Sequence, residues 1–365
     1  MRAARIEASR FRNLASLDAE LPAGGVVFLG QNGQGKTNLL ELLYYPVLFR
    51  SLRGVRDVDL VQHGQPGFHL RVTVAGAGVS RTIEAGFLTA GRRKRVAVDG
   101  TPPLRVTDAL GVWLAVAFLP ADVGLISGGA ADRRLYLDRT LGLASPDYLR
   151  ALRQYRAALA QRNAALRRGL AEAAWAFDPL LARYGSTLVQ MRLAWVETAG
   201  PEWASGCAAL GEPMAVTMGY RGKRELADPA GWSEVLVGSR QRDLNTGVTG
   251  VGPQRDDLTF RLGDAPLRVV GSTGQQRTAA IALKLCERDT LRRAAGREPA
   301  LLLDDVFAEL DRDRQERLAE RLELTSGRAQ VFITAPRVDE LPPGLSLPVV
   351  QVAGGEIARL GAVTG

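Results

Sequence analysis

The residues Gly30–Thr37 constrain this chain more than any other feature. They read GQNGQGKT and satisfy the phosphate-binding loop pattern GxxxxGKT in full. Glycines let such a backbone curl, so that successive N–H groups and the start of the following helix point toward phosphate oxygens. Lys36 would then reach the β- and γ-phosphates, and Thr37 would ligate Mg²⁺. The residues expected to bind a nucleotide here are Gly30, Gln31, Asn32, Gly33, Gln34, Gly35, Lys36 and Thr37.

The flanks of this loop have the character that the pattern requires. Gly25–Leu29 is apolar and predicts a short buried strand, and Asn38–Tyr45 predicts a helix that ends before Pro46. The chain has 43 arginines and only 4 lysines, yet the loop keeps Lys36. A compact ammonium fits among phosphates where a planar guanidinium does not. A glycine-rich turn without nucleotide chemistry is therefore the weaker interpretation.

A second segment, Pro299–Asp305, is an apolar run that ends in two adjacent acids. A buried parallel strand has this composition, and open α/β sheets bind ligands at the carboxyl ends of their strands. We expect Asp304 to hold Mg²⁺, usually through water, and Asp305 to polarise the attacking water. A solvated strand end or a helix cap is the alternative, and an isolated pair of acids would favour it.

A third segment, Ser272–Thr278, reads STGQQRT and opens the helical pattern Ala279–Cys286. Ser272 and Gly274 at a helix start would make a second anion-binding N-terminus, about 235 residues after the first. On its own this is a weak signal. Two further short segments flank it, GPQRDDL at Gly252–Leu258 and AELD at Ala308–Asp311.

The order of these segments resembles the ABC-type ATPase heads of the SMC group, and within that group the RecF family. The resemblance spans nearly the whole chain. It also includes RFRNL (Arg10–Leu14), LPADVGLISG (Leu119–Gly128), RRLYLD (Arg133–Asp138), LLLDDVFAELD (Leu301–Asp311) and VFIT (Val331–Thr334).

The resemblance implies roles for residues that spacing alone does not assign. STGQQRT would be the ABC signature, which closes over ATP held by the partner subunit's phosphate loop, and AELD would be the D-loop at the dimer interface. Arg12 and Asn13 would lie near the nucleotide of their own subunit. The signature residues expected to contact the partner's ATP are Ser272, Gly274 and Gln275.

Two positions depart from the usual RecF pattern, and a third agrees with RecF but differs from ABC transporters. Ala121 stands where RecF proteins usually carry Glu, which leaves Asp122 as a metal-side or Q-loop-like group. Gln254 replaces the histidine that is common in this motif, so a titrating side chain is absent there. Thr334 occupies the place where ABC transporters carry a switch histidine, as it does in RecF. None of these changes removes the phosphate and Mg²⁺ machinery.

A helical stretch separates the outer motifs. Ser145 with Pro146 predicts a helix from residue 146 to about 168, and Asp178 starts a second helix that ends near Thr198, before Gly200–Pro201. A chain of 365 residues has no room for the long coiled coil of SMC proteins. We therefore expect an α/β fold, an ABC-type P-loop ATPase head (lobe I, residues 1–125 and 247–365) with an inserted, mainly helical lobe II (residues 126–246).

The net charge of +8 is uneven, because residues 1–100 carry 14 bases and 8 acids. This excess fits an anionic partner such as nucleic acid, although a general bias toward arginine explains it equally well. Gly91–Arg95 precedes Val96–Gly100 and predicts a hairpin that turns at Asp99–Gly100. A charged strand edge that discourages aggregation is the alternative. The candidate DNA-binding residues are Arg92, Arg93, Lys94 and Arg95.

Other features exclude several classes of protein. Two cysteines far apart in sequence and two histidines rule out a structural zinc site of Cys and His. The longest uncharged and mostly apolar run, Ala109–Ala121, is shorter than the roughly 20 residues of a membrane span. The N-terminus carries charges where a secretory signal would be apolar. We expect a cytoplasmic protein without a membrane partner.

The resemblance implies an ATP-dependent DNA-binding protein for the repair of single-strand gaps and stalled replication forks, within replication, recombination and the SOS response. ATP and Mg²⁺ would close two heads into a homodimer on single-strand/double-strand junctions or double-stranded DNA. Slow, DNA-stimulated hydrolysis would reopen it. Partners would be RecR and RecO, which load RecA. A transporter's nucleotide-binding subunit shares the ATP motifs but lacks GPQRDDL, and a P-loop phosphotransferase has no use for STGQQRT.

Overall fold

The structure is a computed structural model that describes residues 1–76, 78–326 and 328–358. Its contacts divide the chain into two compact units, Met1–Asp122 with Glu287–Gly365, and Val123–Cys286. The first division lies three residues before the expected boundary at 125. The second lies 40 residues after the boundary expected at 246, within helix α9 (Thr273–Ala295). The start of α9 belongs with the second unit because Trp203 Nε1 donates a hydrogen bond to the Ala279 carbonyl at 2.9 Å.

The first unit contains a six-stranded sheet in the order β14-β13-β3-β12-β11-β7. Its strands are parallel except for β14, which pairs antiparallel with β13. The four strands β3, β12, β11 and β7 are buried at every residue, as expected for continuous apolar runs covered on both faces. Their bounds are β3 Gly25–Leu29, β7 Ala115–Phe118, β11 Ala300–Asp304, β12 Val331–Ala335, β13 Val349–Ala353 and β14 Glu356–Ile357.

The first unit also contains a five-stranded antiparallel sheet in the order β2-β1-β4-β5-β6. Apolar and polar residues alternate along its strands, which predicts one buried and one solvated face. Ile6, Val72 and Ile83 are fully buried on the inner face. Its strands are β1 Arg2–Phe11, β2 Leu14–Glu20, β4 Gly67–Gly76, β5 Val79–Leu88 and β6 Arg93–Val98.

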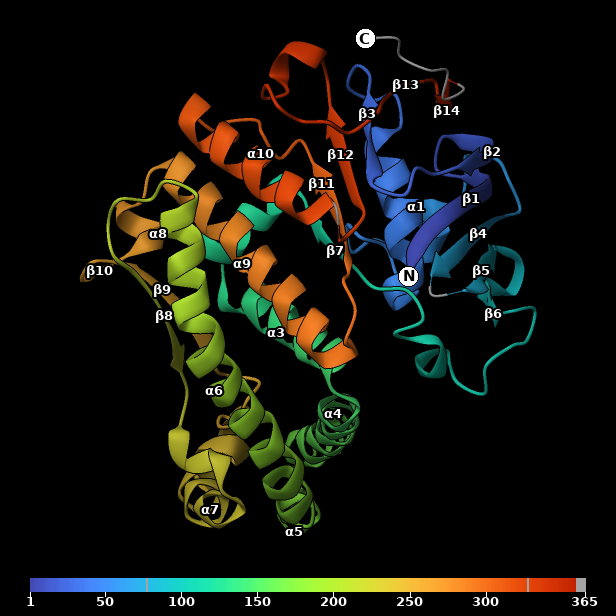
Figure 1. Ribbon diagram of the computed structural model, residues 1–365. Helices are drawn as coiled ribbons and strands as arrows, with labels where there is room; N and C mark the ends of the chain where they lie inside the picture. The colour runs from blue at the N-terminus through green and yellow to red at the C-terminus, as the bar shows by residue number, and fades with distance from the viewer. Residues whose placement is uncertain (77, 327, 359–365) are drawn as a thin grey trace. The chain divides into compact units, whose positions relative to one another are not determined.

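Helix α1 (Lys36–Leu48) lies between these two sheets and contacts strands of both (Figure 1). This enclosure explains why the helix is apolar around most of its circumference. The expectation that it ends before Pro46 is wrong. The helix continues to Leu48, because a proline in the last turn removes only one hydrogen bond and the surrounding packing compensates. Phe49, with φ 51°, ends the helix by donating its N–H to the Tyr45 carbonyl at 2.6 Å.

Further helical segments complete the first unit. They are η1 Asp57–Leu60, η2 Ala90–Arg92, η3 Val106–Ala109, η4 Pro120–Val123, α10 Arg312–Ser326 and η6 Val338–Glu340, of which η4 ends at the first residue of the second unit.

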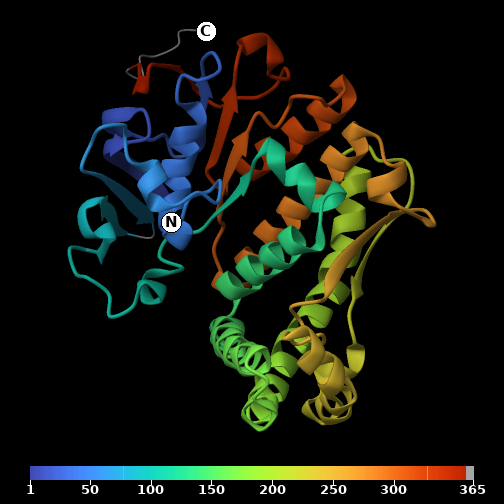
Figure 2. The same ribbon diagram turned by 180° about the vertical axis from the view of Figure 1, so that it is seen from behind.

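The second unit is mainly helical and carries a small antiparallel sheet in the order β10-β9-β8 (Figure 2). Its helices are α2 Gly124–Ser127, α3 Ala130–Ala144, α4 Pro146–Arg167, α5 Ala171–Trp175, α6 Asp178–Ala209, η5 Arg224–Ala227, α7 Pro229–Thr246, α8 Leu267–Val270 and the part of α9 as far as Cys286. Its strands are β8 Val216–Arg221, β9 Asp257–Leu262 and β10 Ala265–Pro266. In the described residues no helix is long enough for the coiled coil of an SMC arm.

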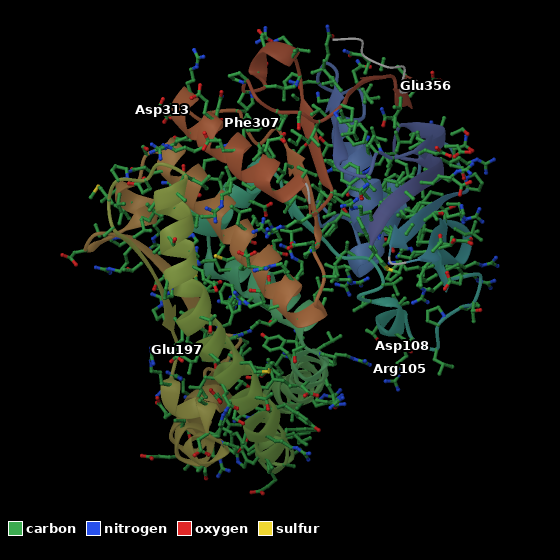
Figure 3. The ribbon with its side chains drawn as sticks, in the orientation of Figure 1. Arg105, Asp108, Glu197, Phe307, Asp313 and Glu356 are labelled. Atoms are coloured by element: carbon green, nitrogen blue, oxygen red, sulfur yellow. The ribbon has the colours of Figure 1, made fainter. Side chains whose placement is uncertain are left out.

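The two long helices follow the sequence signals at their starts. Ser145 caps α4, since its hydroxyl accepts the Tyr148 N–H at 3.2 Å, and Pro146 takes the first helical position. The expected end of α6 near Thr198 is wrong, because the helix runs on to Ala209. Pro201 and Glu197, four residues before it, are both exposed, so water can bind the carbonyl that proline leaves unpaired. Glu197 is labelled on this helix in Figure 3.

None of the helices in the described part of the chain combines the length and apolar composition that crossing a membrane would require.

Candidate nucleotide-binding site

The phosphate loop and the acidic strand end that the sequence predicted lie at the carboxyl edge of the six-stranded sheet. The phosphate loop follows β3, and Asp304 is the last residue of β11. In the parallel register Asp304 lies opposite Thr334 of β12, which lies opposite Phe28 of β3. Because these strands run in the same direction, their ends meet at one edge of the sheet.

The loop backbone depends on its glycines. Gly33 and Gly35 have φ values of 82° and 112°, in a region that residues with a side chain rarely adopt. A Cβ at Gly35 would lie 2.8 Å from the amide atoms of Asn13, and one at Gly30 would lie 2.3 Å from the Val352 carbonyl oxygen. The loop conformation and its close neighbours therefore both require glycine.

The Lys36 ammonium group is held inside the loop. It donates hydrogen bonds to the carbonyls of Gly30 at 2.5 Å and Gln31 at 3.1 Å, and the residue is only 5% exposed. Burial of a charged group without polar partners would be costly, and these carbonyls supply the partners. An anion in the loop would compete with the carbonyls for the ammonium protons.

Thr37 and Asp304 form the contact at the centre of the site. The Thr37 hydroxyl lies 2.9 and 3.0 Å from the two Asp304 carboxylate oxygens. Thr334 also donates its hydroxyl to Asp304, at 2.7 Å. These are hard oxygen donors, which suit Mg²⁺ held by one carboxylate, a hydroxyl, water and phosphate oxygens. Within the described residues no group of three or more His, Cys, Asp or Glu side chains is gathered, so phosphate and water would supply the other ligands.

Asp305 adjoins this contact in an unusual conformation. Its φ is 46°, and its N–H donates to the Thr334 hydroxyl at 3.0 Å. Burial raises the pKa of Asp305, the charge of Asp304 raises it further, and Lys36 opposes the change. A carboxylate with a raised pKa accepts a proton more readily than an ordinary aspartate does. Thr334 therefore links the two acids, a role that the sequence did not single it out for.

Asn13 and Gln34 connect the loop to two other segments. Asn13 donates to the Gln34 carbonyl at 3.1 Å and accepts from Asn38 of α1 at 2.7 Å. The turn Gly354–Gly355 between β13 and β14 donates to the side chain and the carbonyl of Gln34 at 2.6 and 2.8 Å. Sequence reasoning missed this turn, although two adjacent glycines after an apolar strand were a usable signal.

Arg12 contacts the helix after the loop rather than the loop itself. Its Nε donates to Glu41 Oε2 at 2.9 Å, and its Nη1 donates to the Asp59 carbonyl at 3.0 Å. Glu41 is fully buried and also accepts the Ser51 hydroxyl at 2.5 Å and pairs with Arg53 at 3.3 Å. These bonds tie the segment of Arg12 to α1, and Glu41 is the partner that sequence reasoning missed.

Asp122 lies just beyond β7, the strand next to β11. Its carboxylate accepts the Leu119 N–H at 2.8 Å and so stabilises the turn after the strand. The structure thus places Asp122 at the same edge of the sheet as Asp304, where its carboxylate is hydrogen-bonded within its own turn. Its role toward a metal stays a prediction.

The signature segment lies in the second unit. Ser272 and Gln275 cap α9 reciprocally: the Ser272 hydroxyl accepts the Gln275 N–H at 3.3 Å, and the Gln275 side chain accepts the Ser272 N–H at 2.9 Å. Gln275 also donates to Glu212 at 3.1 Å. Gly274 lies in the first turn. The structure therefore builds these residues into a helix N-terminus, as the sequence predicted, and their role toward a partner's nucleotide stays a prediction.

The four basic candidates do not form one equivalent group. Arg92, Arg93 and Arg95 are exposed. Lys94 is held by the Phe49 carbonyl at 2.6 Å and Asp57 at 2.7 Å, and lies over the Tyr45 ring. Its ammonium therefore stabilises the fold, because two oxygen partners and an aromatic face already surround it.

The hairpin around these bases also differs from the expectation. The turn at Asp99–Gly100 exists, with φ values of 52° and 75°, but it leads only to a single bridge between Val98 and Thr101. The strand that pairs along β6 is the preceding β5, so the arginines lie at the β5–β6 connection and on the edge strand. The prediction of a hairpin with the following segment is wrong.

Comparison with known proteins identifies close relatives, although no family model matches the chain. The chain is 37% identical to the DNA replication and repair protein RecF of Frankia alni over 371 aligned residues, which cover 96% of this chain and 97% of that protein. It is 35% identical to the protein of the same name from Anaeromyxobacter sp., with the same coverage.

Solved structures give a consistent result. A structure of the recombination mediator protein RecF with ATP in the RecFOR pathway has a TM-score of 0.88 and is 29% identical, covering 98% of this chain and 97% of that one. An Smc head bound to the C-terminal winged-helix domain of ScpA has a TM-score of 0.58 at 13% identity, which shows the shared ABC-type ATPase head fold alone.

Proposed function

Because the chain belongs to the RecF family of DNA replication and repair proteins, we propose that it is an ATP-dependent DNA-binding protein of recombinational repair. It acts at single-strand gaps and stalled replication forks, in the cytoplasm. The contact between Thr37 and Asp304 carries the proposal, because it joins the phosphate loop to the acidic strand end at one edge of the sheet.

The site binds and hydrolyses ATP with residues of the first unit. The Lys36 ammonium and the loop N–H groups hold the phosphates. Thr37 and Asp304 hold Mg²⁺, which neutralises phosphate charge when it is bound. Asp305 orients the attacking water and accepts its proton. Thr334 fixes both acids, since its one hydroxyl donates to Asp304 and accepts from the Asp305 N–H.

ATP closes two copies of the chain face to face. The N-terminus of α9, with Ser272, Gly274 and Gln275, approaches the γ-phosphate held by the partner, because a helix N-terminus attracts an anion. The D-loop Ala308–Asp311, which follows β11, lies at the same dimer interface. Ala308 and Glu309 are exposed, and Asp311 caps α10 by accepting the Arg314 N–H at 2.9 Å. Hydrolysis is slow and reopens the dimer, so ATP acts as a timer for DNA engagement.

DNA is the anionic partner, and junctions of single and double strands are its preferred form. Arg92, Arg93 and Arg95 contact phosphates. RecR and RecO act with this protein to load RecA. A solved relative is described as a recombination mediator of the RecFOR pathway, which supports this assignment.

Two measurements on the purified full-length chain test the function. The first is the ATP hydrolysis rate with and without gapped DNA, with Lys36→Met as the control that removes the phosphate-binding ammonium. The second is the oligomeric state by light scattering with and without ATP. Stimulation by DNA and ATP-dependent dimerisation are expected. A monomer in both states, or hydrolysis indifferent to DNA, contradicts the proposal and favours a phosphotransferase or a transporter subunit.

A further inference from the structure

A cavity of about 290 Å³ lies within the second unit, among α3, α4, α6 and the loop before β9. Its walls mix leucine side chains with charged groups. The leucines of the lining are Leu135, Leu152, Leu159 and Leu188. The polar ones that matter here are Arg134, Asp138, Arg156 and Arg192. None of them belongs to the phosphate loop, the signature or the basic segment Arg92–Arg95.

A network of hydrogen bonds joins several residues of the cavity wall. Arg192 is 2% exposed and donates to Asp138 at 2.8 Å, to the Tyr148 hydroxyl at 3.0 Å and to the Pro253 carbonyl at 2.7 Å. Tyr155 donates to Gln254. A buried network with its partners in place holds one geometry, so the cavity is preformed rather than a transient gap.

Two arginines at the cavity keep unused donors. Among the described residues, Arg156 is exposed and makes one bond, to Asp138 Oδ2 at 2.7 Å, and Arg134 makes one, to the Asp256 carbonyl at 2.9 Å. A guanidinium has five N–H groups, so most of them remain available. The charged groups of the lining are three arginines and Asp138, which pairs with both Arg156 and Arg192, so the lining itself has an excess of positive charge, although Asp256 lies 4.0 Å from Arg192.

An exposed leucine lies beside these charges. Leu135 is 63% exposed, although it lines the cavity together with three other leucines. An apolar cavity rimmed by polar groups is typical of a binding site. A buried apolar side chain would fill the volume, and a carboxylate on the same ligand would pair with the guanidinium groups in the bidentate geometry that arginine favours.

We propose that this cavity binds an acidic peptide segment of a partner protein, which inserts one large apolar side chain between Leu135 and Leu159 and pairs its carboxylates with Arg134 and Arg156. Nucleic acid fits less well, because sequence-tolerant binding of bases needs exposed aromatic faces and Tyr155 is buried and hydrogen-bonded. The site is separate from the proposed ATP chemistry.

Selection from a phage-displayed library of short random peptides on the full-length protein tests the proposal. Enriched peptides are expected to carry Asp or Glu next to Phe, Leu, Met or Trp. Synthetic versions with a fluorescent label then give affinities by anisotropy. The variants Arg156→Glu and Leu135→Asp should each weaken binding by about tenfold or more, and raised salt should weaken it as well.

Matched variants keep the result interpretable. Arg153→Glu is the control for Arg156→Glu, because Arg153 is an exposed arginine of the same helix, α4. Leu180→Asp is the control for Leu135→Asp, because Leu180 is an exposed leucine of α6. Neither Arg153 nor Leu180 lines the cavity. Both should leave the peptide affinity within about twofold of the unmodified protein. ATP binding should be unchanged in all four variants, which shows that they are folded.

Three results would overturn the inference. One is the absence of any enriched peptide. Another is equal affinity of the enriched peptides for the Leu135→Asp protein and its Leu180→Asp control. The third is displacement of the peptide by a single-stranded oligonucleotide, which would assign the cavity to nucleic acid. None of these results depends on ATP hydrolysis, so the proposed function can stand or fall separately.

Discussion

The Thr37 hydroxyl lies 2.9 and 3.0 Å from the two carboxylate oxygens of Asp304, although the residues are 267 positions apart in the sequence. The parallel sheet brings them together, because the phosphate loop and the end of β11 open at the same edge. Thr334 adds a second hydroxyl to the carboxylate at 2.7 Å. Asp304 is thereby fixed as an acceptor, and the role of Asp305 beside it toward the attacking water stays a proposal.

The two adjacent acids should fail in different ways. Asp304→Asn removes the charged metal ligand and should weaken Mg²⁺-dependent ATP binding by about tenfold or more. Asp305→Asn should bind ATP normally but hydrolyse it about 10²- to 10⁴-fold more slowly, since the proton acceptor is lost. The second variant should accumulate as an ATP-bound dimer. Nucleotide titration and single-turnover hydrolysis measure the two effects, and equal loss of affinity in both would refute the division of roles.

Asp305 should also make the stability of the folded protein depend on pH. Burial and the neighbouring charge raise the pKa of Asp305. The folded state then binds this proton more tightly than the unfolded state, so this contribution to stability is full below the unfolded pKa, about 3.9, and is lost as pH rises through the folded pKa. Asp305→Asn should therefore raise the Tm at neutral pH. It should also reduce the loss of Tm that the ionisation of Asp305 causes as pH rises above about 4.

Asp99 supplies a control, because its pKa is lowered in the folded protein whereas that of Asp305 is raised. The Thr82 N–H, followed by Arg81, lowers the pKa of Asp99. Its contribution to stability is present above the unfolded pKa and is lost as pH falls through the folded pKa. Asp99→Asn should leave the Tm at neutral pH unchanged or slightly lower. If thermal melts show both variants moving in the same direction, the interpretation of Asp305 is incorrect.

Ser272 should act on the ATP of the other subunit. Arginine at the N-terminus of α9 adds bulk and positive charge and leaves Lys36 and Thr37 unchanged in the sequence. Ser272→Arg protein should bind ATP almost normally, yet fail to dimerise and hydrolyse. Mixing it with Lys36→Met protein should restore part of the activity, because one heterodimer site is then intact. Normal hydrolysis by monomeric Ser272→Arg protein would exclude action in trans.

The four basic residues Arg92, Arg93, Lys94 and Arg95 should separate into two groups. Changing Arg92, Arg93 and Arg95 together to alanine should weaken DNA binding at low salt. The slope of log affinity against log salt should become shallower by up to about 0.9 for each DNA phosphate that the variant no longer neutralises. Lys94→Ala should instead lower the Tm, because Lys94 is tied to Phe49 and Asp57. An unchanged salt slope in the triple variant would assign the arginines to protection of the exposed strand edge.

The glycine turn behind the phosphate loop offers a steric test. A Cβ at Gly355 would lie 2.3 Å from the Asn13 carbonyl oxygen, and its φ is 87°. Gly355→Ala should destabilise the fold by more than about 1 kcal/mol and weaken ATP binding, since Gly355 and Asn13 both brace Gln34. Gly54→Ala is the control: its φ is 75°, but a Cβ there meets nothing within 4 Å. Chemical denaturation of both variants separates steric conflict from backbone strain.

The sequence was sufficient wherever local chemistry decided the outcome. The loop Gly30–Thr37, the strand that ends at Asp304 and the capped start of α9 follow from patterns within a few residues, because glycine freedom, apolar runs and capping hydroxyls act locally. The resemblance that these segments carry also gave the fold and the family.

Tertiary structure decided everything that depended on distant partners. Pro46 lies inside α1 because the surrounding packing compensates for the hydrogen bond that it removes, and Pro201 lies inside α6 because it and Glu197 are exposed to water. Lys94 belongs to the core contacts of Phe49 and Asp57 rather than to a free basic cluster. Thr334 joins Asp304 to Asp305 only because β12 lies beside β11. Such effects arise from burial and the strand register, and no short stretch of sequence specifies either of them.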